Sequence, residues 1–154
     1  MADTKITGLT LGTPVSGDVT PYVSDPTGTP VTKKALMPIS GTYTPTLGNV
    51  TNVAASTLNQ DFQYIRVGSI VQVSGSIAVD PTSAATQTVL SITLPIASNF
   101  ATIHDGNGIA ACAASGEPAA ALIANIAGDI MYMQYYPVSN ANQGWRVSFM
   151  YKII

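Results

Sequence analysis

Cysteine, histidine and charged side chains are all scarce in this chain of 154 residues. Cys112 is the only cysteine and His104 the only histidine. A single cysteine cannot form an intrachain disulfide, and no Cys/His cluster exists that could bind zinc. Because Cys112 lies in a run of small residues with no base near it, we interpret it as a small buried side chain. We expect no metal site and no cofactor.

Charge is equally sparse. Asp, Glu, Lys and Arg make up 9% of the chain, and the formal net charge is -2, whereas about 25% is usual for a soluble domain. The absence of a basic block argues against nucleic acid or an anionic membrane as a partner. The surface must instead be covered by Ser, Thr, Asn and Gln, or by other subunits.

Long hydrophobic runs are also missing. The first residues have neither the basic start nor the apolar core of a secretory signal, and every apolar stretch is too short to span a bilayer. We therefore expect a chain that is soluble before any assembly.

Candidate catalytic groups are few and scattered. His104 and Asp105 stand in a sequence typical of a loop, His-Asp-Gly-Asn-Gly, and no G-x-S-x-G elbow occurs. The remaining carboxylates of the second half fall mostly at expected strand ends or turns. Acid/base catalysis needs two carboxylates that converge, and no spacing here suggests it. We predict that the protein is not an enzyme and has no catalytic residues.

Alternating hydrophobicity is what the chain does have, most clearly from Phe62 to Asp80. Val71, Val73, Ile77 and Val79 recur at even spacing, and Gly68-Ser69 suits a two-residue type II′ turn. The stretch predicts a β-hairpin with one buried face.

The same pattern continues to the C-terminus and predicts an all-β fold, an eight-stranded antiparallel sandwich of jelly-roll type. The expected strands are Thr42–Leu47, Gln60–Val67, Ile70–Val79, Gln87–Leu94, Gly108–Ser115, Ala119–Ile126, Ile130–Tyr136 and Gly144–Ile153. The Ala119–Ala127 stretch could equally begin a helix, because Pro118 suits a first helical turn.

Residues 1–40 differ from residues 41–154, and we expect two parts. Five prolines (Pro14, Pro21, Pro26, Pro30 and Pro38) rule out a long helix in the first part, and Asp25-Pro26-Thr27-Gly28 predicts a turn between two extended pieces. So few apolar groups cannot repay the entropy of ordering. This leader should be ordered only by docking on something else.

Large side chains gather in the stretch Met131-Tyr132-Met133-Gln134-Tyr135-Tyr136. Two interpretations stay open. The strand is buried on both faces, or Met131, Met133 and Tyr135 pack across a subunit interface, where Met and Tyr are enriched. The alanine-rich stretches before it fit a close approach of chains around a symmetry axis, or a thin sandwich.

Residues 4–37 resemble the N-terminal segment of phage tail-fibre, tail-spike and head-fibre proteins, with an I-x-x-L start and a T-K-K return strand. The resemblance implies docking on another virion protein, such as a capsid, portal, adaptor or tail component. The docking residues it implies are Ile6, Leu9, Pro14, Asp18, Pro21, Tyr22, Val23, Asp25, Thr32, Lys33 and Lys34.

Residues 41–67 and the strand-rich remainder resemble trimeric jelly-roll domains of phage proteins. The resemblance implies a homotrimeric virion structural protein, a short fibre or decoration on the head or tail. Tyr136 and Trp145, if exposed, are candidates for contact with a host surface glycan. The alternatives are a secreted trimeric module of the complement or cytokine type and, less favoured, a small polysaccharide hydrolase.

Overall fold

The computed structural model describes residues 19–24, 31–36, 39–113 and 116–154, and for the first two ranges it describes the backbone alone. The described chain is all β, as predicted, with twelve strands and no helix. It accordingly holds no helix that could cross a membrane. The strands are β1 Val19–Ser24, β2 Val31–Leu36, β3 Ile39–Tyr43, β4 Leu47–Thr51, β5 Val53–Leu58, β6 Phe62–Val67, β7 Ile70–Pro81, β8 Thr88–Thr93, β9 Gly106–Cys112, β10 Ala120–Asn125, β11 Ile130–Tyr135 and β12 Gln143–Lys152.

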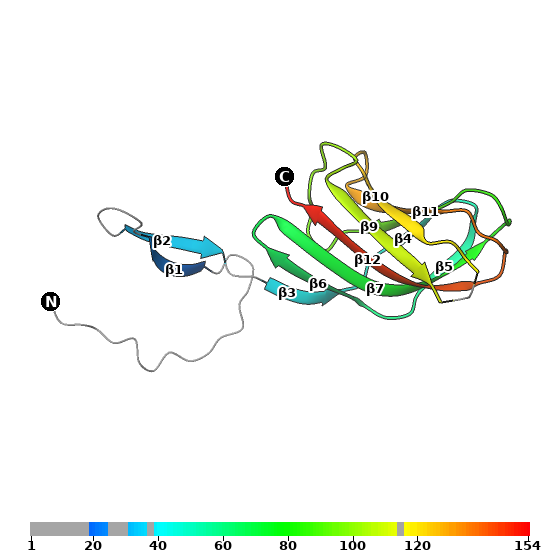
Figure 1. The fold of residues 1–154 in the computed structure, drawn as a ribbon, viewed down its shortest axis with the longest axis horizontal. Helices are drawn as coiled ribbons and strands as arrows, with labels where there is room; N and C mark the ends of the chain where they lie inside the picture. Colours follow the sequence, from blue (N-terminus) through cyan, green and yellow to red (C-terminus); the bar gives the residue numbers. More distant parts are fainter. Residues whose placement is uncertain (1–18, 25–30, 37–38, 114–115) are drawn as a thin grey trace.

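Ten of these strands form one antiparallel sheet that curls around a single core (Figure 1). The order across the sheet is β3-β6-β7-β12-β9-β10-β11-β8-β4, and β5 pairs with the distal half of β7. The sequence predicted eight strands for this domain, and the structure has ten.

The predicted hairpin is confirmed as β6 and β7. Val67 pairs with Ile70 across Gly68-Ser69, and Gly68 has a φ of 61°. This angle is typical of the first central residue of a type II′ turn, which glycine adopts without steric cost. Val71, Val73, Ile77 and Val79 are all buried, so the alternation read from the sequence fixes which face of β7 meets the core.

Residues 44–58 depart most from expectation, because the sequence predicted a strand at 42–47 and none from 48 to 59. The chain instead leaves β3, crosses to the opposite edge of the sheet, pairs with β8 as β4, and returns along β7 as β5. Tyr43 Oη donates to the carbonyl of Thr93 at 3.1 Å. This crossing brings the two edges of the curled sheet together.

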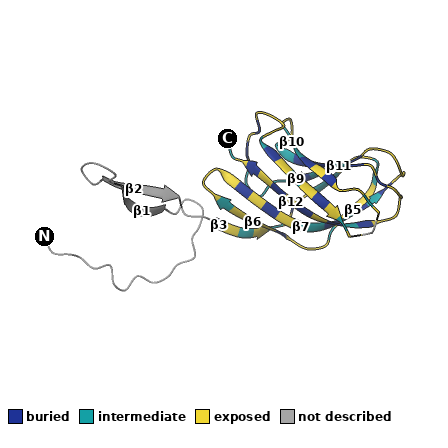
Figure 2. Cartoon of the chain, in the orientation of Figure 1, coloured by how far each residue is buried: buried dark blue, intermediate teal, exposed yellow. Residues whose placement is uncertain are grey.

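Buried and exposed residues alternate along the strands of the sheet (Figure 2), and the buried set combines small and large side chains. Phe62 covers Gly75, where an added Cβ would lie 2.0 Å from Phe62 Cδ1. Ala110, Ala120 and Ala124 are buried in the same core as Trp145 and Met133. The alanine-rich stretches thus leave room for aromatic rings within one protomer. Cys112 is half-buried against this core.

The proposed subunit-interface residues lie in the protomer core. Met131 and Met133 are fully buried and Tyr135 is 4% exposed, in one cluster with Trp145 and Leu122. Alternation along β11 turns these three side chains inward and leaves Tyr132 and Gln134 on the outer face. The strand is thus buried on one face and half-buried on the other, which matches neither interpretation in full, and the three proposed interface residues lie on the buried face.

In the leader, β1 and β2 form a two-stranded antiparallel ladder that shares no pairing with the ten-stranded sheet within the described residues. Tyr22 pairs with Lys33 and Val23 with Thr32. The predicted docking residues Ile6, Leu9, Pro14, Asp18 and Asp25 lie outside the described residues. Their role stays a prediction.

Candidate binding surfaces

The ten-stranded sheet has two ends with different loops. The proximal end carries the β6–β7 turn, the β8–β9 loop and the β10–β11 turn, and the leader joins β3 there, since Ile39 pairs with Arg66. The distal end carries the β7–β8, β9–β10 and β11–β12 loops (Figure 1). The ten residues of β12 connect the two ends, a length of about 30 Å. Residues 99–107 thus lie at the proximal end and residues 139–144 at the distal end.

A hollow on the outer surface of the distal end combines an aromatic ring with amides. The hollow, about 340 Å³ in volume, is lined by Gln87, Pro118, Ala119, Ala121, Gln134, Tyr135 and Tyr136. Tyr136 is 58% exposed. A tyrosine ring beside primary amides offers an apolar face together with hydrogen-bond donors and acceptors. Such a set suits a small polar ligand with an apolar face, for example a sugar ring.

Glu117 holds the loops beside this hollow. Its carboxylate accepts hydrogen bonds from the backbone N–H groups of Val138 at 2.9 Å and Ser139 at 3.2 Å, and from the Gln143 side-chain amide. Hydrogen bonds to a charged acceptor are stronger than neutral ones. The loop that presents Tyr136 is therefore tied down by a carboxylate from the β9–β10 loop.

Asn52 likewise holds the β7–β8 loop in place through side-chain hydrogen bonds. Its Nδ2 donates to the Ser83 carbonyl and to Thr88 Oγ1, both at 2.8 Å, and to the Thr86 carbonyl at 3.1 Å, while its Oδ1 accepts from the Ser83 N–H at 2.9 Å. Its φ is 54°, in the left-handed region that asparagine tolerates. One side chain thus fixes the β4–β5 turn and closes the neighbouring loop.

Three buried polar atoms beneath the distal loops have no hydrogen-bond partner among the described residues: Tyr135 Oη, Trp145 Nε1 and Gln143 Oε1. The Tyr135 and Trp145 rings pack against each other at a centroid distance of 4.4 Å, with their planes tilted by 56°. Burial, and secondarily the Glu117 charge, raises the pKa of Tyr135, so the phenol stays neutral. Trp145 is fully buried, so it does not meet the condition of exposure set for a host contact, and Tyr136 alone of the two candidates does.

Two aspartates order the proximal loop. Asp129 accepts from the N–H groups of Ser98 at 2.8 Å and Phe100 at 3.2 Å. Asp105 accepts from the N–H groups of Thr102 at 2.6 Å and Ala101 at 3.0 Å. His104 lies exposed on the same loop. Asp105, Glu117 and Asp129 all hold loops through backbone hydrogen bonds, and the described residues contain no group of three His, Cys, Asp or Glu that could hold a metal ion.

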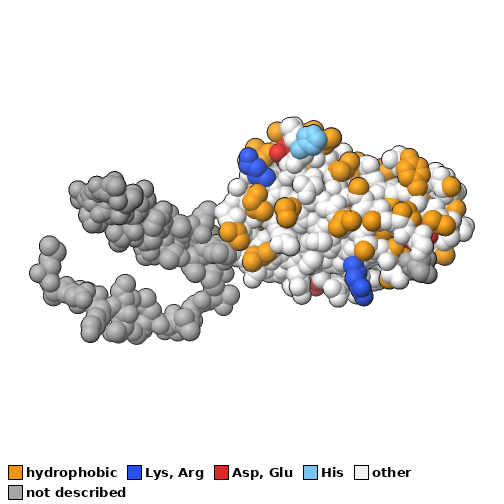
Figure 3. Space-filling model, viewed as in Figure 1, with side chains coloured by type: hydrophobic (Ala, Val, Ile, Leu, Met, Phe, Trp, Pro, Cys, Tyr) orange, Lys and Arg blue, Asp and Glu red, His pale blue; other side chains and the backbone are white. Residues whose placement is uncertain are grey.

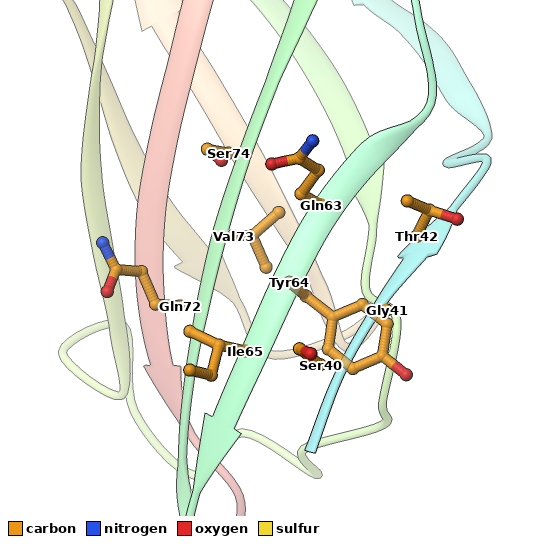
Figure 4. Close-up of a pocket in the computed structure, with 9 residues that line it drawn as sticks. All are labelled: Ser40, Gly41, Thr42, Gln63, Tyr64, Ile65, Gln72, Val73 and Ser74. Carbon is orange, nitrogen blue, oxygen red and sulfur yellow. The ribbon is translucent and has the colours of Figure 1, made fainter. Parts of the chain in front are cut away.

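The third surface is the proximal part of the outward face of β6, β7, β12 and β9, which we call the sheet face. It consists of Gln63, Ile65, Val67, Ile70, Gln72, Ser74, Asn107, Ile109, Ser148, Met150 and Lys152. Figure 3 looks onto the same side of the molecule and shows hydrophobic and uncharged polar side chains with few charges. A hollow of about 510 Å³ lies at one border of the sheet face, over β3, β6 and β7, where Ile65 and Gln72 stand beside Ser40 and Thr42 (Figure 4).

Comparisons of this chain with protein-family models, with curated proteins and with solved structures found no match.

Proposed function

We propose that this protein is a virion structural protein of a phage, a short fibre or decoration on the head or tail. The leader docks it on another virion protein, and the ten-stranded sheet projects as a jelly-roll-like domain of a homotrimer. Its place is the assembled particle, and its partners are its own copies, the virion protein that receives the leader and a host surface glycan.

The observation that carries the proposal is the separate β1–β2 ladder. An isolated two-stranded hairpin is marginally stable at best in water, and this one shares no ladder with the large sheet within the described residues. Pairing with a strand of another protein would supply the missing hydrogen bonds, in the manner of β-augmentation. The leader joins the sheet at the proximal end, about 30 Å along β12 from the distal loops. Docking at one end therefore leaves the other end free.

Trimerisation would strengthen this docking without any new contact. A single leader with few apolar groups binds weakly, but three leaders joined through their sheet domains bind as one unit with a high effective concentration. The distal hollow with Tyr136 would then be displayed three times, which suits weak contacts with a repeating glycan.

Deletion of residues 2–37 tests the proposal. The shortened chain keeps every strand of the ten-stranded sheet, so it should fold and form trimers. Supplied in cells that assemble particles without the native protein, it should be missing from purified particles, whereas the full chain is incorporated. Normal incorporation of the shortened chain would refute docking by the leader.

A further inference from the structure

The outward face of a sheet is normally polar where it meets water, whereas the sheet face of this protein combines polar groups with exposed hydrophobic side chains. Among the described residues, eleven large hydrophobic side chains are exposed, and five of them stand on the sheet face: Ile65, Val67, Ile70, Ile109 and Met150. Ile109 is 57% exposed and Met150 is 48% exposed. Exposed apolar side chains that gather in one place mark an interaction site.

The register of the strands makes these residues neighbours. Ile65 pairs with Gln72, Gln72 with Met150, and Met150 with Asn107. One row closer to the distal end, Ser148 pairs with both Ser74 and Ile109, and in the most proximal row Ile70 pairs with both Val67 and Lys152. The five hydrophobic side chains are thus distributed over one continuous grid, and hydroxyl and amide groups fill the positions between them.

The size of this surface matches one partner's share of a stable interface. With strands about 4.8 Å apart and outward residues about 6.7 Å apart along each strand, four strands and three rows cover roughly 400 Å² of flat area. Ser40 and Thr42 of β3 and Ala121 and Ile123 of β10 continue the surface on both sides, which brings the flat area to roughly 600 Å². Side chains that stand up from the sheet add accessible area, and about 800 Å² per partner is typical of a specific interface.

The chemistry of the sheet face favours a second copy of the same chain over a different partner. The amides of Gln63, Gln72 and Asn107 both donate and accept hydrogen bonds, so they can pair with the same groups of another copy. Lys152 stands at the proximal corner of the sheet face, and Arg146 stands one row beyond Ser148, at its distal border. The rows between these two cations carry no charge, so copies that meet here do not oppose like charges across the centre.

We infer that the sheet face is the surface through which three copies associate, each turning β6, β7, β12 and β9 toward a common axis. This inference rests on the proposed trimer and adds which surface forms it. The leader enters β3 beside β6, at the proximal edge of this surface. Three leaders would consequently leave the assembly at the same end, which is the arrangement that multivalent docking needs.

The test compares masses in solution by light scattering after size-exclusion chromatography. The full chain should have the mass of three chains of 15.9 kDa. The double variant Ile109→Lys with Met150→Lys places two cations on the exposed grid and should shift the mass to that of one chain. The matched control, Val50→Lys with Val138→Lys, adds the same charge at side chains that are exposed elsewhere and should stay trimeric. Far-UV circular dichroism and thermal melting establish that both variants are folded.

Each outcome decides a different point. A trimeric Ile109→Lys/Met150→Lys variant overturns the inference and leaves the trimer itself standing. Loss of the trimer in both double variants also overturns it, because the effect would then come from net charge. A monomeric full chain overturns the trimer and the sheet-face interface together, while docking of the leader is still decided by particle incorporation.

Discussion

At the scale of single residues, glycines that lie under aromatic rings set the shape of the core. Gly75 faces the interior of the sheet, and Phe62 occupies the space of its missing side chain. We expect Gly75→Ala to lower the free energy of unfolding by about 1–3 kcal/mol, because the ring must move out of a packed position. Urea denaturation of the variant and the parent measures this loss.

Gly144→Ala is the matched control for that substitution. The added Cβ at Gly144 would lie 3.9 Å from Ala113 Cβ, an ordinary contact distance, so the stability should change by less than about 0.5 kcal/mol. Equal losses in the two variants would show that the position of Phe62 has nothing to do with the effect.

The second prediction for a single residue concerns the stability of variants at Asn52. Asn52→Ala removes four hydrogen bonds of the distal loops and forces alanine into the left-handed region. We expect a loss of about 2–4 kcal/mol. Asn52→Gly restores the backbone freedom but not the hydrogen bonds, so its loss should be smaller yet still clear. If Asn52→Gly is as stable as the parent in urea denaturation, the hydrogen bonds contribute nothing.

The prediction about host contact concerns Tyr136. We expect Tyr136→Ala to weaken adsorption of particles to host cells without changing the melting temperature, because the ring is exposed and stands at a surface hollow. Val138→Ala removes an exposed side chain from the same loop and should leave adsorption unchanged. Unaltered adsorption of the Tyr136→Ala particles would remove the distal hollow from the list of contact sites.

At the scale of elements, period-two alternation predicted the strands that have one buried face. β7 and β12 alternate over almost their whole length, and both were expected, at Ile70–Val79 and Gly144–Ile153. The stretch that forms β10 could have been a helix on its own propensity, but pairing with β9 and β11 holds it extended. β4 and β5 escaped prediction because both are largely exposed edge strands without a regular apolar pattern.

The candidate site residues were also only partly predictable from the sequence. The exposure of Tyr136 and the burial of Trp145 depend on how the folded chain covers each side chain, and the sequence offered both residues as candidates. The roles of Asn52 and Glu117 depend on residues more than twenty positions away. Asn52 is followed by Val53-Ala54-Ala55, which carries no local signal for a loop closed thirty residues later.

The proximal loop gives a prediction about pH. Hydrogen bonds from the Thr102 and Ala101 backbone, and the nearby Lys152 charge, hold the pKa of Asp105 below its ordinary value of 3.8. Because the pKa is lower in the folded state, the contribution of Asp105 to stability is present above pH 3.8 and is lost as the pH falls through the folded value. Asp105→Asn should therefore lose less stability than the parent between pH 5 and pH 2, as measured by thermal melting. Parallel pH profiles would mean that this carboxylate is not coupled to folding.

At the scale of the whole molecule, we propose that the leader and the sheet domain have separate tasks. The core side chains of the described residues all belong to the sheet domain, and the β1–β2 ladder of the leader shares no pairing with that sheet within the described residues. The outer surface of the domain has few charged residues. This composition suits a surface that packs against other copies, as proposed for the trimer, better than one that is exposed to water on a monomer.

The most direct measurement is cosedimentation of the purified full chain, and of the chain that lacks residues 2–37, with particles assembled without this protein. We expect the full chain to bind saturably, with a bound number that is a multiple of three per docking site, and the shortened chain to remain in the supernatant while keeping its oligomeric mass. Equal binding of both chains, or binding of neither, would contradict the account.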